Sequence, residues 1–181
     1  MSTERSFPVW KTVKLGVCKN AVEYRKRLEE KGFFIDVLSA SLASDLGQPR
    51  PYHPLDDISC LQEVTSVDLV KVMAKELGLN SPTSYKDFCA KGVEVGLRLC
   101  PAEVAPALRL IYTKQGHPDR FLWIAMETII LEASRAGGQM EVVFVLLKYG
   151  TRGELWIQWF CVDPRVAVFR PKDSLVFVSP R

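Results

Sequence analysis

Six consecutive apolar residues, Val142 to Leu147, constrain the fold of this 181-residue chain more than any other stretch. A strand with no polar residue on either side has to be buried on both faces, so it lies in the middle of a sheet. We therefore predict a long central strand over Met140–Tyr149, a tight connection, and a further strand over Glu154–Val162. Phe121–Met126 is also apolar on both faces and predicts a second central strand.

The region before that second strand predicts a short helix and a hairpin. Pro101 suits the first position of a helix, because its missing N–H has no partner to lose there. Pro106 is expected to end this helix, since proline disfavours helical geometry in the residue before it. Leu108–Tyr112 then has the β-branched and aromatic character of a strand. We expect it to pair with Phe121–Met126 as an antiparallel hairpin.

The same region resembles a group of small, uncharacterised bacterial proteins. Their shared core has the form LGLxLCPAEVxPxLRLxY, followed by WLxIAMExI. The matching residues here are Gly96, Leu97, Leu99–Val104, Pro106, Leu108–Leu110, Tyr112, Leu122–Glu127 and Ile129. The segments Trp10–Gly16 and Val176–Val178 also look similar to the group. Ala105 stands where the group often has glycine. The resemblance implies a shared fold, and it implies no functional residue because the group has no known activity.

The N-terminal part predicts one strand and two helices. Val9–Leu15 alternates as an edge strand does, with lysines that discourage stray pairing. Asn20 is a suitable N-cap for a helix over Ala21–Lys31. Asp36 is a suitable N-cap for a second helix that ends at Gly47.

The middle of the chain predicts a strand over Val64–Met73, one helical turn ending at Gly78, and then a longer helix. Ser81–Pro82 is expected to open that helix and Gly96 to end it. Its apolar face is expected to hold Tyr85, Phe88, Cys89 and Val93. Leu175–Val178 is the last predicted strand.

Together these elements predict an α+β fold. The C-terminal half is expected to form a mainly antiparallel sheet of about five strands with a covering helix. Residues 48–60, which hold three prolines, are expected to be a loop or linker. They would separate an N-terminal strand and helical part, residues 1–47, from a sheet domain, residues 61–181. The alternative is one domain that carries a long loop.

Composition narrows the functional classes. A net charge of +3 permits contact with nucleic acid but does not indicate it. An odd number of cysteines without a Cys-x-x-Cys motif is typical of reduced thiols in a cytoplasmic protein. We expect no membrane span and no secretion signal. Two histidines far apart in sequence predict no metal site, and no motif predicts a cofactor.

Three charged residues are the candidate catalytic set. Arg109 would bind an anion, Glu127 would act as general base, and Glu103 and Tyr112 would line the same pocket. Arg109 and Tyr112 are therefore also candidate ligand-binding residues. The alternative is structural, with Arg109 and Glu127 forming an ion pair between two strands.

A second candidate site lies on a sheet face. Trp156, Gln158 and Phe160 alternate along one predicted strand, so their side chains share a face. If that face is open, it is a surface for a protein partner or for single-stranded nucleic acid. Packing of these rings in the core is the alternative.

The chain shows no clear pairing of a nucleophile with a base, and it is rich in sheet aromatics. We therefore expect a non-enzymatic binding or regulatory module that uses a sheet face or shallow pocket. A protein partner or self-association is favoured over nucleic acid. The alternatives are a small hydrolase or nuclease-like enzyme with a carboxylate and arginine pocket, and an oligomeric structural protein.

Overall fold

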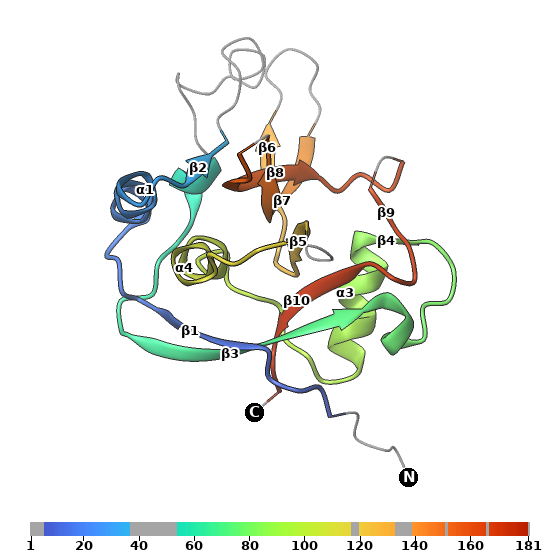
Figure 1. The fold of residues 1–181 in the computed structure, drawn as a ribbon. Helices are drawn as coiled ribbons and strands as arrows, with labels where there is room; N and C mark the ends of the chain where they lie inside the picture. Colours follow the sequence, from blue (N-terminus) through green and yellow to red (C-terminus); the bar gives the residue numbers. More distant parts are fainter. Residues whose placement is uncertain are drawn as a thin grey trace.

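The computed structural model describes residues 6–36, 54–116, 120–132, 139–150, 152–165 and 167–180. These residues form an eight-stranded sheet, a two-stranded sheet and three α-helices (Figure 1). The strands of the large sheet are β1 (Lys11–Leu15), β2 (Phe34–Ile35), β3 (Thr65–Met73), β5 (Phe121–Ile124), β6 (Ile129–Glu132), β7 (Gln139–Tyr149), β8 (Glu154–Cys161) and β10 (Ser174–Val178). The small sheet pairs β4 (Thr83–Ser84) with β9 (Val168–Phe169). The helices are α1 (Ala21–Glu30), α3 (Tyr85–Glu94), α4 (Val104–Ile111) and the 3₁₀-helices η1 (Pro54–Asp57) and η2 (Ala74–Leu77).

The strand order of the large sheet is β1-β3-β10-β5-β7-β8-β2, and β6 pairs with β7. Most neighbours are antiparallel, as predicted, but β10 with β5 and β8 with β2 are parallel. The predicted number of strands, about five, was too small, because β1, β2 and β3 from earlier in the chain join the strands of the C-terminal half. The strands also do not follow the order of the chain, since β10 lies between β3 and β5.

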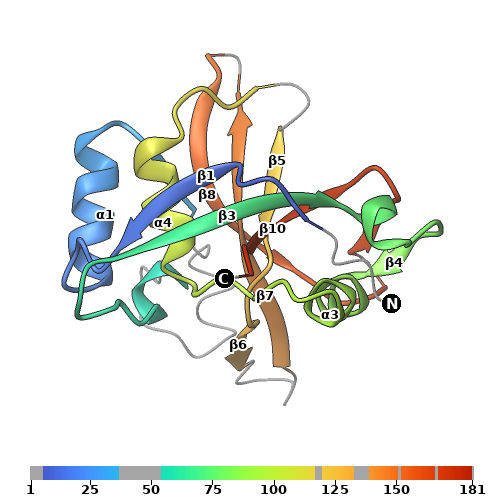
Figure 2. The ribbon, with the colours of Figure 1, turned by 90° about the horizontal axis from the view of Figure 1, so that it is seen from below.

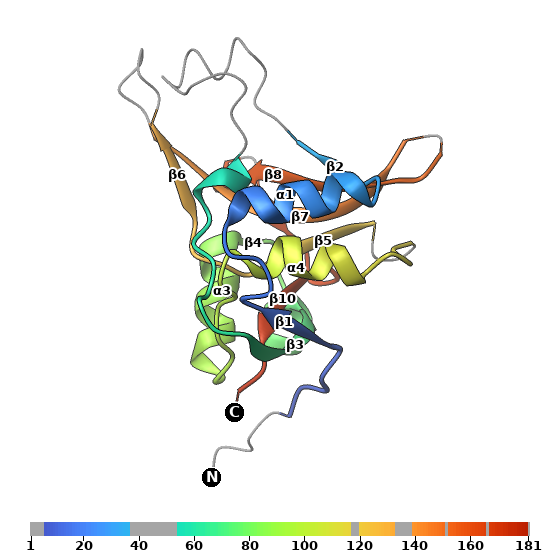
Figure 3. The same cartoon turned by 90° about the vertical axis from the view of Figure 1, so that its left-hand side faces the viewer.

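The large sheet curls around α4, with β1 and β3 on one side of this helix and β7 and β8 on the other (Figure 1). Helix α1 lies beside α4 at the open side of the curl (Figure 3). We call the sheet face that contacts α4 the inner face and the opposite one the outer face. Helix α3 lies at the far end of the molecule from α1, next to β4 (Figure 2).

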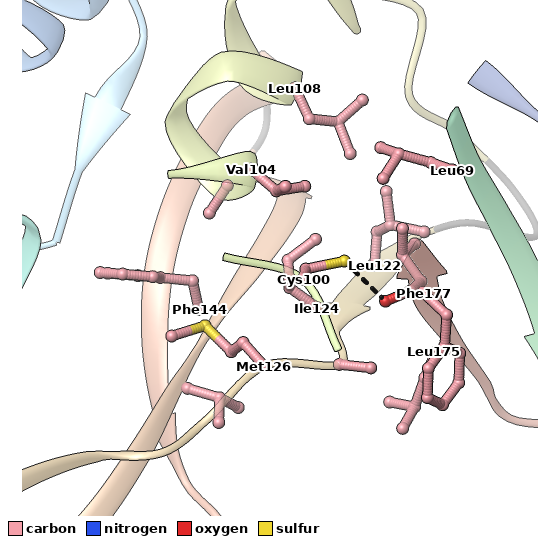
Figure 4. Close-up of a cluster of buried hydrophobic side chains, with 14 of the residues drawn as sticks. Leu69, Cys100, Val104, Leu108, Leu122, Ile124, Met126, Phe144, Leu175 and Phe177 are labelled. Atoms are coloured by element: carbon pink, nitrogen blue, oxygen red, sulfur yellow. Dashed lines mark hydrogen bonds between the residues drawn. The ribbon is translucent and has the colours of Figure 1, made fainter. Parts of the chain in front are cut away.

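The inner face and α4 together form the main core. Along β7, Leu146 pairs with Leu122 of β5 and with Ile157 of β8, and all three side chains are fully buried. Val104 and Leu108 extend from α4 into this buried cluster (Figure 4). Burial of each such side chain contributes roughly 1.5–3 kcal/mol, which makes the contact between α4 and the sheet a large part of the fold's stability.

The predicted strand Leu108–Tyr112 and its hairpin are wrong, because Leu108 to Ile111 belong to α4 and Tyr112 is its C-cap. Pro106 does not end the helix. It occupies the first turn, where backbone N–H groups have no acceptor within the helix and proline is tolerated. The residues from Val104 to Arg109 are all buried, so the helix has no polar face. Such a helix is stable only when it is enclosed, as α4 is here.

Other local predictions are confirmed with small shifts. Asn20 caps α1 by accepting a hydrogen bond from the Glu23 backbone N–H. Helix α3 begins at Tyr85 with Ser84 as its cap, rather than at the predicted Ser81–Pro82. The predicted turn ending at Gly78 is η2, and the predicted edge strand is β1, which pairs with β3. The second N-terminal helix lies outside the described residues.

The outer face is covered in two different ways. Over β10 it is covered by α3, whose Phe88 contacts Phe177 of β10 and Phe169 of β9. Over β7 the cover consists of large side chains from the neighbouring strands. Val145 pairs with Trp123 of β5 and with Gln158 of β8, and it is fully buried although the side chains beside it are only half-buried.

Close packing between α3 and β10 makes Gly92 a sensitive position. A Cβ atom on Gly92 would lie 2.5 Å from Cε1 of Phe177, which is fully buried. We expect Gly92→Ala to lower the free energy of unfolding by about 1–3 kcal/mol through overpacking. In an uncrowded helix the same change would raise it by up to about 1 kcal/mol.

Urea unfolding followed by circular dichroism measures this effect. Phe177→Leu, which makes room beside the helix, is expected to reduce the cost of Gly92→Ala in a double-mutant cycle. A Gly92→Ala protein that is more stable than the wild type would show that the helix and strand are not in close contact.

Candidate binding site on the outer face

Glu103, the first candidate catalytic residue, is a fully buried structural carboxylate. Its Oε1 accepts hydrogen bonds from the Gly16 backbone N–H and the Tyr24 hydroxyl, both at 2.7 Å. Its Oε2 accepts one from the Leu61 backbone N–H at 2.8 Å. Burial and the hydrogen bond to Glu103 raise the pKa of Tyr24 well above its usual value, so the hydroxyl keeps the proton that it donates. Glu103 thus joins the start of α4 to three other segments.

Arg109, the second candidate, is also fully buried, at the end of α4. Its guanidinium donates to Gln115 Oε1 at 2.6 Å and to the backbone carbonyl of Tyr112. The Phe33 ring lies on the guanidinium as well, with 5.6 Å between the ring centroid and Cζ. Burial lowers the pKa of Arg109 to about 10, so it stays charged at neutral pH. Gln115 in turn donates to the Leu146 carbonyl at 2.8 Å, so this chain of contacts connects α4 with β7.

Glu127, the third candidate, is exposed and does not pair with Arg109. It lines a cavity of about 650 Å³ between α3 and the connection from β5 to β6, and neither Glu103 nor Arg109 lines this cavity. The charges beside it are paired, with 2.8 Å between Lys86 Nζ and Glu141 Oε1. The three candidate residues therefore do not meet in a shared pocket. Tyr112 lies with Arg109, and its ring contacts that of Trp10 at 5.2 Å.

The sheet-face candidates share one face, as the alternation predicted, and this face is the outer one. Trp156, Gln158 and Phe160 pair with alternate residues of β7 and are half-buried. The Trp156 ring stacks on the Phe34 ring of β2 with 4.7 Å between centroids and 22° between planes. Phe34 is 43% exposed, so the outer face remains accessible at this end.

A cavity of about 570 Å³ opens on the same face, between β5 and β8 on one side and the β9–β10 connection on the other. Four aromatic side chains line it, from Phe121, Trp123, Phe160 and Phe169. The Trp123 ring lies 5.3 Å from the Phe160 ring and 5.0 Å from the Phe169 ring, between centroids. We call this space the outer cavity. Its size is within the range of small-molecule sites, and its walls have the aromatic character usual for them.

The outer cavity also has two cationic side chains in its lining, Arg120 and Lys172. Neither makes an ion pair with any other residue that the structure describes. The Arg120 guanidinium lies over the Phe121 ring, 5.7 Å from its centroid. Asp173, the acidic residue of the lining, accepts a hydrogen bond from the Arg170 backbone N–H at 2.6 Å. This carboxylate stabilises the turn before β10 and makes no ion pair with Arg120 or Lys172.

Of the residues that line this cavity, the sequence predicted Phe160 as a site residue and missed those of β5 and of the β9–β10 region. The Phe121–Trp123 pair lies at i and i+2 directly after Arg120, which is a period-two signal for one strand face. That signal was hidden because Leu122 and Ile124 are apolar too, so the strand looked buried on both sides. Val168, Phe169 and Lys172 come from another part of the chain, and no local pattern connects them with β5.

Among the described residues, no group of three His, Cys, Asp or Glu side chains is arranged to hold a metal ion. No helix within the described ranges has the length and apolar character needed to span a membrane. All five cysteines are free thiols, and Cys100 donates to the Val176 carbonyl within the core (Figure 4).

Comparison of the chain with protein-family models, with curated proteins and with solved structures found no match.

Proposed function

We propose that this protein is a binding module and that the outer cavity is its binding site. One observation carries the proposal. Four aromatic rings surround a space of about 570 Å³, and two cations without an ion-pair partner among the described residues lie beside them. Half-exposed aromatic surface beside unpaired charge is typical of ligand sites, because a bound ligand buries the rings and pairs the charge.

The contacts of the Glu103 carboxylate and the Arg109 guanidinium support a non-enzymatic role. Both oxygens of Glu103 and both terminal nitrogens of Arg109 make hydrogen bonds within the fold, which favours a structural task over proton transfer. A general base has to lie within hydrogen-bond reach of a substrate proton, and Glu103 is enclosed with three protein donors instead. The enzymatic alternative therefore has less support than binding at the outer cavity.

Filling the cavity mouth tests the proposal. Val168 lines the outer cavity and is 51% exposed, so Val168→Trp would place an indole in the opening without disturbing the core. We expect ligand-observed NMR with a library of small aromatic fragments to detect binding to the wild type and a loss of it in Val168→Trp. Val22→Trp is the matched control, because Val22 is 57% exposed and lies on α1.

Fragment binding that is equal in the wild type and both variants would assign the ligands to another surface. A wild type that binds no fragment would count against a cavity ligand altogether. Light scattering of the same samples distinguishes ligand binding from self-association. If the wild type is a dimer and only Val168→Trp is a monomer, the outer face is a contact between two copies.

A further inference from the structure

We infer that the ligand of the outer cavity is single-stranded nucleic acid, with a base among the aromatic rings and phosphates beside Arg120 and Lys172. This inference rests on the proposed function and specifies its ligand. Stacking of bases on aromatic side chains combined with cations along the backbone path is how single strands are bound without sequence readout. Both parts are present in one cavity here.

The accessible ring surface is the first support. Phe121 is 45% exposed at the cavity, while Trp123 and Phe160 are half-buried beside it. A planar base that enters here would cover ring faces that water now contacts. Each base stacked in this way is worth about 1–3 kcal/mol by alanine substitution in other single-strand binders.

Charge is the second support, and it favours nucleic acid over an apolar or cationic ligand. The lining offers Arg120 and Lys172 without an ion pair to any described residue, against one carboxylate that is engaged in a turn. An anionic group beside the rings would satisfy both cations. The Arg120 guanidinium already lies over the Phe121 ring, so one phosphate and one base would be held by adjacent side chains.

The extent of the aromatic surface is the third support, and it favours a strand over a single nucleotide. Phe121 and Trp156 lie in one row across the outer face, since both pair with Leu147 of β7. Neighbouring strands are about 4.8 Å apart, so these two residues lie two strand spacings from each other. The Phe34 ring continues the row, stacked on Trp156. A ligand with several bases would use more than one of these positions.

Fluorescence anisotropy with short labelled oligothymidylate and oligouridylate tests the inference on the full chain. We expect binding that weakens as salt increases. The double variant Arg120→Ala/Lys172→Ala is expected to reduce the slope of log affinity against log salt by about 1.4. Lys14→Ala/Lys19→Ala, which removes the same charge from residues that do not line the outer cavity, is expected to leave the slope unchanged.

Stacking is tested separately from charge. Phe121→Ala is expected to weaken binding about fivefold or more at constant salt. Ile130→Ala is its control, because Ile130 is also exposed, at 54%, but lies on β6 and does not line the cavity. Val168→Trp should abolish oligonucleotide binding as it abolishes fragment binding.

The outcomes separate this inference from the proposed function. If fragments bind and oligonucleotides do not, the nucleic-acid inference is overturned and the binding cavity stands; if neither binds, both fail. Oligonucleotide binding that is unchanged in the Phe121 and Arg120/Lys172 variants overturns the assignment to this cavity. Three further probes can overturn the inference if they bind as tightly as the oligonucleotides. A blunt duplex would indicate a site for any polyanion, and polyglutamate would indicate an acidic peptide as the ligand. A mononucleotide would indicate a free nucleotide.

Discussion

Gly16→Ala is expected to lower the free energy of unfolding by about 3–5 kcal/mol, because two separate costs fall on one position. Gly16 has a φ of +72°, in the left-handed region that favours glycine. A Cβ atom there would also lie 2.3 Å from the backbone carbonyl oxygen of Glu63. Backbone atoms cannot rotate away as a side chain does. For a chain of this length the loss corresponds to a decrease in Tm of roughly 6–20 °C.

Gly32→Ala separates the two costs. Gly32 has nearly the same φ, +74°, but no atom lies within 4 Å of its added Cβ. We expect this control to cost only the left-handed conformation, about 1–2 kcal/mol. Thermal unfolding of both variants gives the comparison, and equal losses would mean that the segment carrying Glu63 does not lie against Gly16.

Glu103→Gln is the second change with a large expected effect. We expect it to lower the free energy of unfolding by about 3–5 kcal/mol, because a charge-assisted hydrogen bond is lost and a buried donor is left without an acceptor. The carboxylate accepts hydrogen bonds on both oxygens. In either orientation the new amide NH₂ would face the Leu61 N–H, or the Gly16 N–H with the Tyr24 hydroxyl. Donors would then meet donors in a site that water does not reach.

Urea unfolding of Glu103→Gln and of two control variants measures this effect. Tyr24→Phe removes one donor and leaves the carboxylate with two, so we expect a cost near 1 kcal/mol. Glu29→Gln makes the same chemical change at an exposed position on α1 and should stay within about 0.5 kcal/mol of the wild type. A Glu103→Gln protein as stable as Glu29→Gln would contradict the structural role of Glu103 and reopen a catalytic one.

The sequence predicted the elements whose pattern and environment agree. The central residues of β7, Val142–Leu147, are all apolar and all buried, and β8 places its buried residue, Ile157, opposite Leu146 of that strand. α4 was mistaken for a strand because its local signals conflict with its surroundings. Pro106 and the apolar residues after it resemble the start of a strand, and only enclosure within the curl makes a helix without a polar face favourable.

Only the part of the candidate site that lies on a single strand could be predicted from the sequence. Trp156, Gln158 and Phe160 lie on one strand, so their common face follows from period two alone. The outer cavity requires in addition that the connection before β10 lies against β5. That placement depends on a parallel pairing of Leu175 with Trp123, and no periodic pattern in either segment specifies it.

The position of β10 has a consequence for how the chain is made. Leu175 pairs with Val72, roughly a hundred positions earlier, and contacts at such separation slow folding. Within the described sheet, β10 is the backbone link between β1–β3 and the strands from β5 onward. During synthesis a nascent chain would carry two half-sheets with open edges until residues 174–178 emerge from the ribosome. We expect this interval to be the one in which the protein most needs a chaperone.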